Sequence, residues 1–490
     1  MVPAMKYMQQ PWSQATVIMT IAAILHAVLP LDTDIYWLCS VCRRLLSGAV
    51  LYRDIVETNP PMAVWLYLPA VAIEHVTGWA AESVFVALVL IAGAASALAF
   101  ARLAGLSTGG RWLALVVVLL VPLSAFGERE HVALILMVPL LGLAMRRARG
   151  ETVTLWLALV CGLLAGMAPM IKPHFALGLA GAYIAVAVLR RDWRQVLAPE
   201  IVVAGLLAAG YAVSVYVFMP AYAHDVVPLL LDVYRPMRKP LWSLLLSSQV
   251  LTWLMSVGAL WYVLRRFEAG TTMLLAASFG FLIAFVDQGR GWAYHALPMV
   301  ATLMLSVWPA AWPIVATGDE RARMQAVVAC FAAAVNIAGF SVFTFPAQGV
   351  VPVLQAIVEH PTVMGITADQ APGHPITTRV HGIWVGTYSS RWITANSRVL
   401  YGTAVADQAR LVKWMVLDRN VTNADLAKRP DVVLIGLGPY DWTAWIAADP
   451  ETTRLMSGYV LVATDALTPQ RRKTYEGVEA WVRRDLLPAP

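Results

Sequence analysis

Long apolar runs separated by short polar segments occupy the first 345 residues of the chain. Several runs are shorter than the ~20 residues that a membrane-spanning helix needs, so their ends are approximate. The pattern predicts a polytopic α-helical membrane protein with about 11 transmembrane helices. The runs lie at residues 16–30, 83–101, 112–125, 132–145, 153–169, 175–189, 201–219, 241–264, 271–286, 296–315 and 325–345.

The composition supports this fold class. Hydrophobic residues make up 59% of the 490 residues and charged residues 13%, well below the ~25% of a soluble domain. The net charge of +6 comes from basic clusters between apolar runs, which the positive-inside rule explains, so nucleic-acid binding is not expected. The first run lacks a small-residue cleavage site after it and is expected to remain as a transmembrane helix.

Arginine-rich clusters determine the predicted topology, because each follows an apolar run and is expected in the cytoplasm. Counting the crossings from them places the N-terminus in the cytoplasm and residues 32–80 outside the inner (cytoplasmic) membrane. Residues 60–77 then begin and end on one side, and their prolines favour a juxtamembrane helix over a span. The clusters lie at residues 146–149, 190–194, 265–266 and 319–323.

The composition changes near Phe345, and residues 346–490 are polar enough to fold in water. A helical stretch at 404–418 alternates with β-rich runs at 432–436, 458–462 and 478–482, which predicts a small α/β domain. By the count of crossings this domain lies on the periplasmic, extracytoplasmic side.

The first predicted external loop carries the most informative motif. Acidic and aromatic residues at 31–37 are followed by an amphipathic turn at 42–48 and a polar stretch at 51–61. This loop closely resembles the first external loop of the GT-C glycosyltransferases, and the overall layout loosely resembles the aminoarabinose transferases and protein O-mannosyltransferases. The resemblance implies a GT-C-like transmembrane domain over 1–345.

The same resemblance implies an activity. A GT-C enzyme transfers a sugar from a polyprenyl-phosphate-linked donor to a hydroxyl at the membrane surface, here with expected inversion. The acceptor would be a cell-envelope glycan, lipid or protein. A transporter or flippase of lipid-linked sugars is the alternative, but the charges gather at one predicted face and paired halves are not evident.

Glycosyl transfer to a hydroxyl needs a base, and a carboxylate within hydrogen-bond reach can serve. Asp34 is the first candidate and Asp32 the second, although Asp32 can alternatively cap a juxtamembrane helix. Glu57 and Asn59 are candidates for substrate binding. Asp54 and Glu57 can equally be solvated or paired with the neighbouring arginine.

The second external loop, residues 126–131, concentrates two carboxylates, a guanidinium and an imidazole. The resemblance implies a second acidic catalytic position here, filled by Glu130 or Glu128. Glu128, Glu130 and His131 can also ligate a divalent cation such as Mg²⁺, Mn²⁺ or Ca²⁺ beside Asp34. Alternatively, this loop pairs its own charges at the lipid headgroups.

Other predicted external loops carry positive charge suited to a leaving phosphate. The candidates for binding the donor phosphate are Lys172, Arg290, Arg129 and Tyr294. A lone lysine can instead extend to the lipid interface. Further candidates for substrate binding are His131, His174 and His295, and the run at 221–240 is a candidate lipid entrance.

Overall fold

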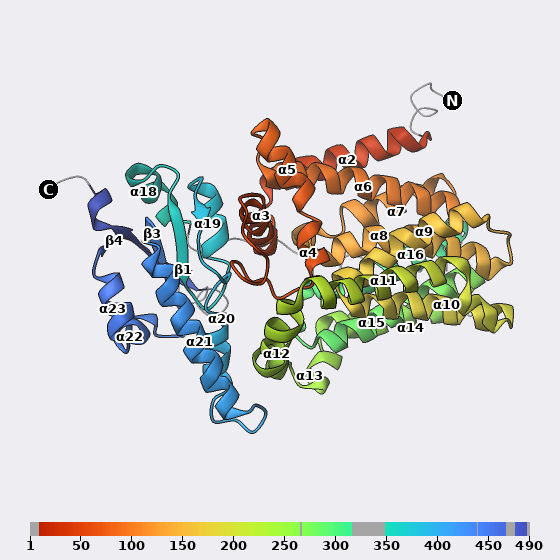
Figure 1. Ribbon diagram of the computed structural model, residues 1–490. Coiled ribbons are helices and arrows are strands. Elements are labelled where there is room, and N and C mark those ends of the chain that lie inside the picture. Colours follow the sequence, from red (N-terminus) through yellow and green to blue (C-terminus); the bar gives the residue numbers. More distant parts are fainter. Residues whose placement is uncertain (1–8, 265–266, 316–347, 439, 467–475, 488–490) are drawn as a thin grey trace.

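The computed structural model describes residues 9–264, 267–315, 348–438, 440–466 and 476–487. A helical bundle lies on one side of the molecule and a sheet covered by helices on the other, with the short helices α3 and α4 between them (Figure 1). Several predicted features lie outside the described residues. They are the domain boundary at 345/346, the span at 325–345 and the basic clusters at 265–266 and 319–323.

Within the described residues, six helices are long and apolar enough to cross a membrane. This finding supports a multi-pass membrane protein. The six are α2 (Pro11–Val28), α6 (Ala81–Leu103), α8 (Arg129–Arg149), α10 with its preceding turn (Pro173–Arg190), α11 (Pro199–Phe218) and α15 (Ala269–Gln288). Shorter helices match further predicted runs: α7 (Thr108–Leu119), α9 (Leu155–Ile171), α14 (Ser248–Leu264) and α16 (Leu297–Val315).

Small residues allow the bundle helices to approach closely, as is usual where lipid provides no hydrophobic driving force between helices. Gly166 of α9 faces Ala204 of α11 so closely that an added Cβ would come within 2.8 Å of the Ala204 Cα. At the end of the bundle that carries the arginine clusters, Glu200 accepts hydrogen bonds from Arg147 Nη2 at 2.8 Å and Tyr183 Oη at 2.7 Å. This buried contact joins α8, α10 and α11.

The segment between the first two long helices forms three short helices, α3 (Thr33–Leu46), α4 (Pro61–Trp65) and α5 (Leu68–Thr77). The stretch at 60–77 is therefore two short helices instead of one. Arg43 of α3 donates to Glu74 of α5 at 2.7 Å and to Glu82 of α6 at 3.0 Å. These ion pairs hold α3 against the bundle.

The connection after α11 consists of short, proline-interrupted turns. They are the π-helical turns Tyr222–Val226 and Leu230–Tyr234, α12 (Val227–Leu229) between them, the 3-10 turn Arg235–Met237 and α13 (Leu241–Leu245). The predicted span at 241–264 is thus divided into α13 and α14.

The C-terminal region contains a five-stranded sheet in the order β2-β1-β3-β5-β4. β1, β2 and β3 are parallel, whereas β5 runs antiparallel to both β3 and β4. The β-rich runs noted in the sequence at 432–436, 458–462 and 478–482 lie in β3, β4 and β5. The strands are β1 (Thr362–Ile366), β2 (Ile383–Trp384), β3 (Val432–Leu437), β4 (Tyr459–Asp465) and β5 (Gly477–Arg483).

Successive side chains of a strand point to opposite faces of the sheet. Both faces of this sheet are covered by buried apolar side chains. Val432 and Leu434 pack in one buried cluster, and Val433 and Ile435 in another with Trp442. The helices of this region are α18 (Val350–Ile357), α19 (Gly373–Arg379), α20 (Trp392–Leu400), α21 (Gln408–Ala427), α22 (Trp442–Ala447) and α23 (Pro450–Met456).

Direct hydrogen bonds join the sheet region to the bundle. Arg44 Nη1 donates to the Gly386 carbonyl at 2.9 Å, and the Val56 backbone N–H donates to the Thr387 carbonyl at 2.8 Å. The Thr387 backbone N–H in turn donates to Asp425 at 2.8 Å. The loop after β2 is therefore bonded on one side to the first loop of the bundle and on the other to α21.

The topology can be tested with single cysteines in a Cys330→Ser background, since Cys39, Cys42 and Cys161 are buried. Val405→Cys, exposed in the sheet region, should react with a membrane-impermeant maleimide in intact spheroplasts. Thr152→Cys, exposed at the opposite end of the bundle, should react only after lysis. Labelling with the reverse sidedness would overturn the predicted orientation.

Candidate functional site

A cavity of about 1200 Å³ lies between the bundle and the sheet region. The segments predicted to be external meet here, because residues from the first loop, the start of α8, the end of α9 and the turn after α15 all line it. Loops at the carboxyl ends of β1 and β2 line it from the other side. The cavity is thus built by both parts of the chain.

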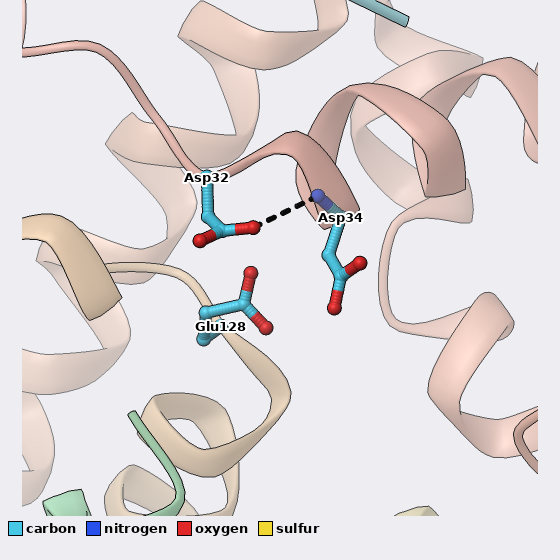
Figure 2. A group of neighbouring side chains, drawn as sticks. All are labelled: Asp32, Asp34 and Glu128. Carbon is cyan, nitrogen blue, oxygen red and sulfur yellow. Dashed lines mark hydrogen bonds between the residues drawn. The ribbon is translucent and has the colours of Figure 1, made fainter. Parts of the chain in front are cut away.

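Asp32 and Asp34 enter the cavity from the start of α3. Asp32 caps this helix, because its Oδ1 accepts a hydrogen bond from the Asp34 backbone N–H at 3.1 Å (Figure 2). Asp32 therefore caps a helix, as one of the two sequence interpretations expected, and it also lines the cavity. The Asp34 carboxylate pairs with Arg129 and accepts a hydrogen bond from the Gln370 side-chain amide.

Arg129 is the first residue of α8 and is only 5% exposed. Besides Asp34, its guanidinium lies 3.8 Å from Glu57 and 3.6 Å from Glu128. Three carboxylates therefore surround this one cation. Arg129 was expected to bind the donor phosphate, but the geometry makes it first of all the residue that orients Asp34.

Glu130, a candidate catalytic and metal-binding residue, lies behind the cavity wall. It is fully buried and does not line the cavity. One of its oxygens accepts a hydrogen bond from Lys172 Nζ at 2.6 Å and lies 3.7 Å from His295 Nε2. Glu130 thus lies behind two residues that do line the cavity and holds the lysine in place.

His131 is also displaced from its expected substrate and metal contacts. The Gly127 backbone N–H donates to His131 Nδ1 at 3.0 Å, and His131 Nε2 lies 2.7 Å from the Val118 carbonyl. Both ring nitrogens are therefore engaged by backbone groups, and the ring does not line the cavity. The positive φ of Gly127 (79°) forms the turn that brings its N–H to this ring.

A different acidic group gathers where the metal was expected. Asp32, Asp34 and Glu128 each offer a carboxylate oxygen within 4.8 Å of the others, and Figure 2 shows the three side chains facing one another. This geometry replaces the predicted set of Glu128, Glu130 and His131 as the candidate cation site.

The charge of this group is incompletely balanced. Among the described residues, no N–H group lies within hydrogen-bond distance of either Glu128 oxygen, and its neighbours are the Asp32 carboxyl and Arg129 Nη2 at 3.6 Å. Burial, followed by the neighbouring Asp32 carboxylate, raises the pKa of Glu128 well above its usual range, and burial raises the pKa of Asp32 to about 6. A proton or a cation shared by these carboxylates would lower their mutual repulsion.

Lys172, Arg290 and Tyr294 all line the cavity. α9 ends directly before Lys172, whose backbone is extended as expected for a residue that precedes proline. Its side chain is only 12% exposed and bonded to Glu130. Lys172 is thus directed into the protein instead of to the lipid interface.

Arg290 lies in a tight turn between Gly289 and Gly291, both with positive φ. Its guanidinium carbon is 3.8 Å from the centre of the Tyr234 ring, and Nη1 donates to the Met237 carbonyl at 3.1 Å. Arg235 and Arg238, from the basic end of the candidate lipid entrance, line the same part of the cavity.

The remaining candidates for substrate binding also line the cavity: Glu57, Asn59, His174 and His295. Glu57 does not pair with Arg53, whose partner is Asp54 at 3.0 Å. Instead, Glu57 accepts hydrogen bonds from the Trp37 indole and, at 2.9 Å, from the Asn59 backbone N–H.

Gln370 also lines the cavity, and the sequence did not predict it. It lies in the loop after β1, and Glu476 holds this loop by accepting hydrogen bonds from the backbone N–H groups of Ala368 at 2.8 Å and Asp369 at 3.1 Å. Burial raises the pKa of Glu476 to about 7. No sequence signal connects a loop residue this far along the chain with Asp34.

No protein-family model and no curated protein matches the chain. Among solved structures, ArnT from Cupriavidus metallidurans bound to undecaprenyl phosphate is similar, with a TM-score of 0.56 and 14% identity over 97% of this chain and 98% of that one. The apo state of the same protein gives a TM-score of 0.53 and 15% identity over the same shares.

An Archaeoglobus fulgidus oligosaccharyltransferase in complex with Zn and sulfate is also similar, with a TM-score of 0.48 and 12% identity over 96% of this chain and 74% of that one. The similarity to ArnT extends over nearly the whole of both chains. The fold of this protein is therefore similar to the fold of ArnT.

Proposed function

We propose that the protein is an integral membrane glycosyltransferase that transfers a sugar from a polyprenyl-phosphate-linked donor to a hydroxyl of a cell-envelope acceptor. The observation that carries this proposal is the meeting of the Asp34 carboxylate with the cations Lys172 and Arg290 in one cavity. The fold supports it, because the similar ArnT structure is bound to undecaprenyl phosphate. The reaction would occur on the extracytoplasmic face of the inner membrane.

The lipid chain of the donor has an apolar route to this cavity. α11 exposes large apolar side chains such as Leu206 and Phe218 on its outer surface. The same helix contributes Ala208, Ala212 and Val215 to the cavity lining. A polyprenyl chain can therefore lie along α11 in the bilayer while its phosphate enters the polar interior.

The donor phosphate would bind to Lys172 and Arg290, whose charges stabilise the phosphate as it leaves the anomeric carbon. Asp34 would accept the proton of the acceptor hydroxyl while that oxygen forms the new bond to the anomeric carbon from the opposite face, which inverts its configuration. Arg129 and Gln370 hold the Asp34 carboxylate in one orientation.

A divalent cation, Mg²⁺, Mn²⁺ or Ca²⁺, fits the group formed by Asp32, Asp34 and Glu128. Carboxylate oxygens are ligands that such hard cations prefer, and no N–H group among the described residues lies within hydrogen-bond distance of the Glu128 oxygens. When bound, the cation would lower the repulsion among these carboxylates.

Asp34→Asn should lower sugar transfer in detergent by at least about 100-fold, because an amide cannot accept the acceptor proton. Radiolabelled polyprenyl-phosphate sugar provides the measurement, and detergent removes the sidedness on which a flippase would act. Asp54→Asn, which alters a half-buried carboxylate of the same loop outside the cavity lining, is the control. Near wild-type transfer by Asp34→Asn would exclude it as the base.

Lys172→Met and Arg290→Gln should each lower kcat/KM for the donor by roughly tenfold to a hundredfold, since a charge-assisted contact contributes about 1.5–3 kcal/mol. Arg53→Gln removes an exposed charge outside the cavity lining and should leave kcat/KM unchanged. Wild-type kcat/KM in both cavity variants would show that they do not bind the phosphate.

The cation site predicts Mn²⁺ binding that Glu128→Gln weakens by at least about tenfold, because one charged ligand is lost. Isothermal titration calorimetry of the protein in detergent measures this affinity. Glu268→Gln, at an exposed carboxylate remote from the group, should bind Mn²⁺ like the wild type. Equal affinities in all three proteins would place any cation elsewhere.

A further inference from the structure

The two walls of the cavity differ in charge. The wall formed by the bundle and its loops carries five basic side chains beside four carboxylates. The basic residues are Arg129, Lys172, Arg235, Arg238 and Arg290, and the acidic ones are Asp32, Asp34, Glu57 and Asp287. The opposite wall comes from the sheet region and contains no lysine or arginine among the described lining residues. We call this second surface the α20 wall and define it by Gln370, Ser389, Ser390, Trp392 and Asn396.

The α20 wall is assembled at the carboxyl ends of two parallel strands. Gln370 follows β1, whereas Ser389 and Ser390 follow β2 and lead into α20. In open α/β sheets, loops at the carboxyl ends of the strands are the usual place for ligands. The position of this wall therefore favours a binding surface.

Trp392 and Asn396 are four residues apart on α20 and so lie on the same face of the helix. The opposite face is anchored, since Ile393 is buried and Thr394 donates to Asp418 at 2.6 Å. Trp392 is half-buried with its ring edge-on to Tyr234. The helix thus presents an indole and an amide to the cavity from a rigid support.

Several polar groups of this wall retain hydrogen-bonding capacity. Within the described part of the chain, the Asn396 amide and the Ser389 hydroxyl have no side-chain hydrogen bond, although both residues line the cavity. An amide can donate and accept simultaneously, which suits neighbouring hydroxyls. An indole presents an apolar face on which the C–H groups of a sugar ring can pack.

The acidic residue beside this wall excludes one class of ligand. Asp369 is the charged residue among the lining residues of the sheet region, and its carboxylate repels phosphate but accepts hydrogen bonds from hydroxyls. A phosphorylated acceptor would find its cations only on the opposite wall, where the donor phosphate is expected. The surface is therefore complementary to an uncharged, hydroxyl-rich ligand.

We infer that the α20 wall binds a neutral saccharide, the acceptor of the sugar. This inference rests on the proposed function and adds the chemical class of the acceptor. Gln370 belongs to this wall and donates to Asp34, so an acceptor lying on the wall would have its hydroxyl beside the base. The donor phosphate would lie across the cavity at Lys172 and Arg290.

Binding can be measured without catalysis on a glycan array. The full-length protein in detergent is applied to neutral hexose and pentose oligosaccharides and to phosphorylated oligosaccharides. We expect binding to at least one neutral class and weaker binding to its phosphorylated counterpart. Trp392→Ala and Asn396→Ala should each lower neutral-glycan binding by about tenfold, since the lost contacts are worth about 1–1.5 kcal/mol.

Val399→Ala, on the exposed face of the same helix, should bind like the wild type. Thermal unfolding of each variant, together with the milder Trp392→Phe and Asn396→Ser, separates lost contacts from lost folding. The inference would be overturned if the protein bound no neutral glycan or preferred phosphorylated glycans. Unchanged binding by the folded Trp392 and Asn396 variants would overturn it as well.

Hydrolysis of the polyprenyl-phosphate sugar in the absence of acceptor distinguishes this inference from the proposed function. The wild type and Val399→Ala should both cleave the donor, because both keep the basic side chains of the bundle wall. If the wild type neither cleaves the donor nor transfers its sugar, the proposed function fails whatever the array shows. If the protein cleaves the donor but binds no neutral glycan, the inference about the α20 wall fails and the proposed function stands.

Discussion

The buried guanidinium of Arg129 organises the centre of this protein. It lies among the carboxylates of Asp34, Glu57 and Glu128, which come from the start of α3, the end of the first loop and the turn before α8. Removing one partner of a buried ion pair typically costs about 3–5 kcal/mol, because an uncompensated charge remains. The cavity can therefore keep several carboxylates close together only while Arg129 is in place.

A second constraint is the contact between the bundle and the sheet region. The backbone of the loop after β2 is bonded to Val56, and Gln370 from the loop after β1 donates to Asp34. Arg391 is fully buried and pairs with Asp418 at 3.2 Å and Asp425 at 3.5 Å, which fixes this loop on α21. The candidate base is thus completed by a residue from the other part of the chain.

This division would allow one cavity to hold the proposed donor and acceptor, which differ in chemistry. The bundle side carries the basic side chains and the apolar surface of α11, along which a polyprenyl phosphate would enter from the bilayer. Hydroxyl, amide and indole groups lie on the opposite wall of the cavity, which belongs to the sheet region. The sheet region and the bundle lie on opposite sides of the molecule (Figure 1). The proposed transfer would take place where the two walls meet, at Asp34.

Hydrophobic periodicity in the sequence determined the helical membrane class, because a segment in lipid must satisfy its own backbone hydrogen bonds. The acidic first loop resembles that of the GT-C glycosyltransferases. Charged residues at the edges of apolar runs marked Asp32, Asp34, Lys172 and Arg290 as candidates, since charge there is costly. Tertiary structure decided which neighbours each charge meets. It turned Glu130 toward Lys172 and His131 toward backbone groups, and it brought Gln370 to Asp34, because long-range packing leaves no periodic signal in the chain.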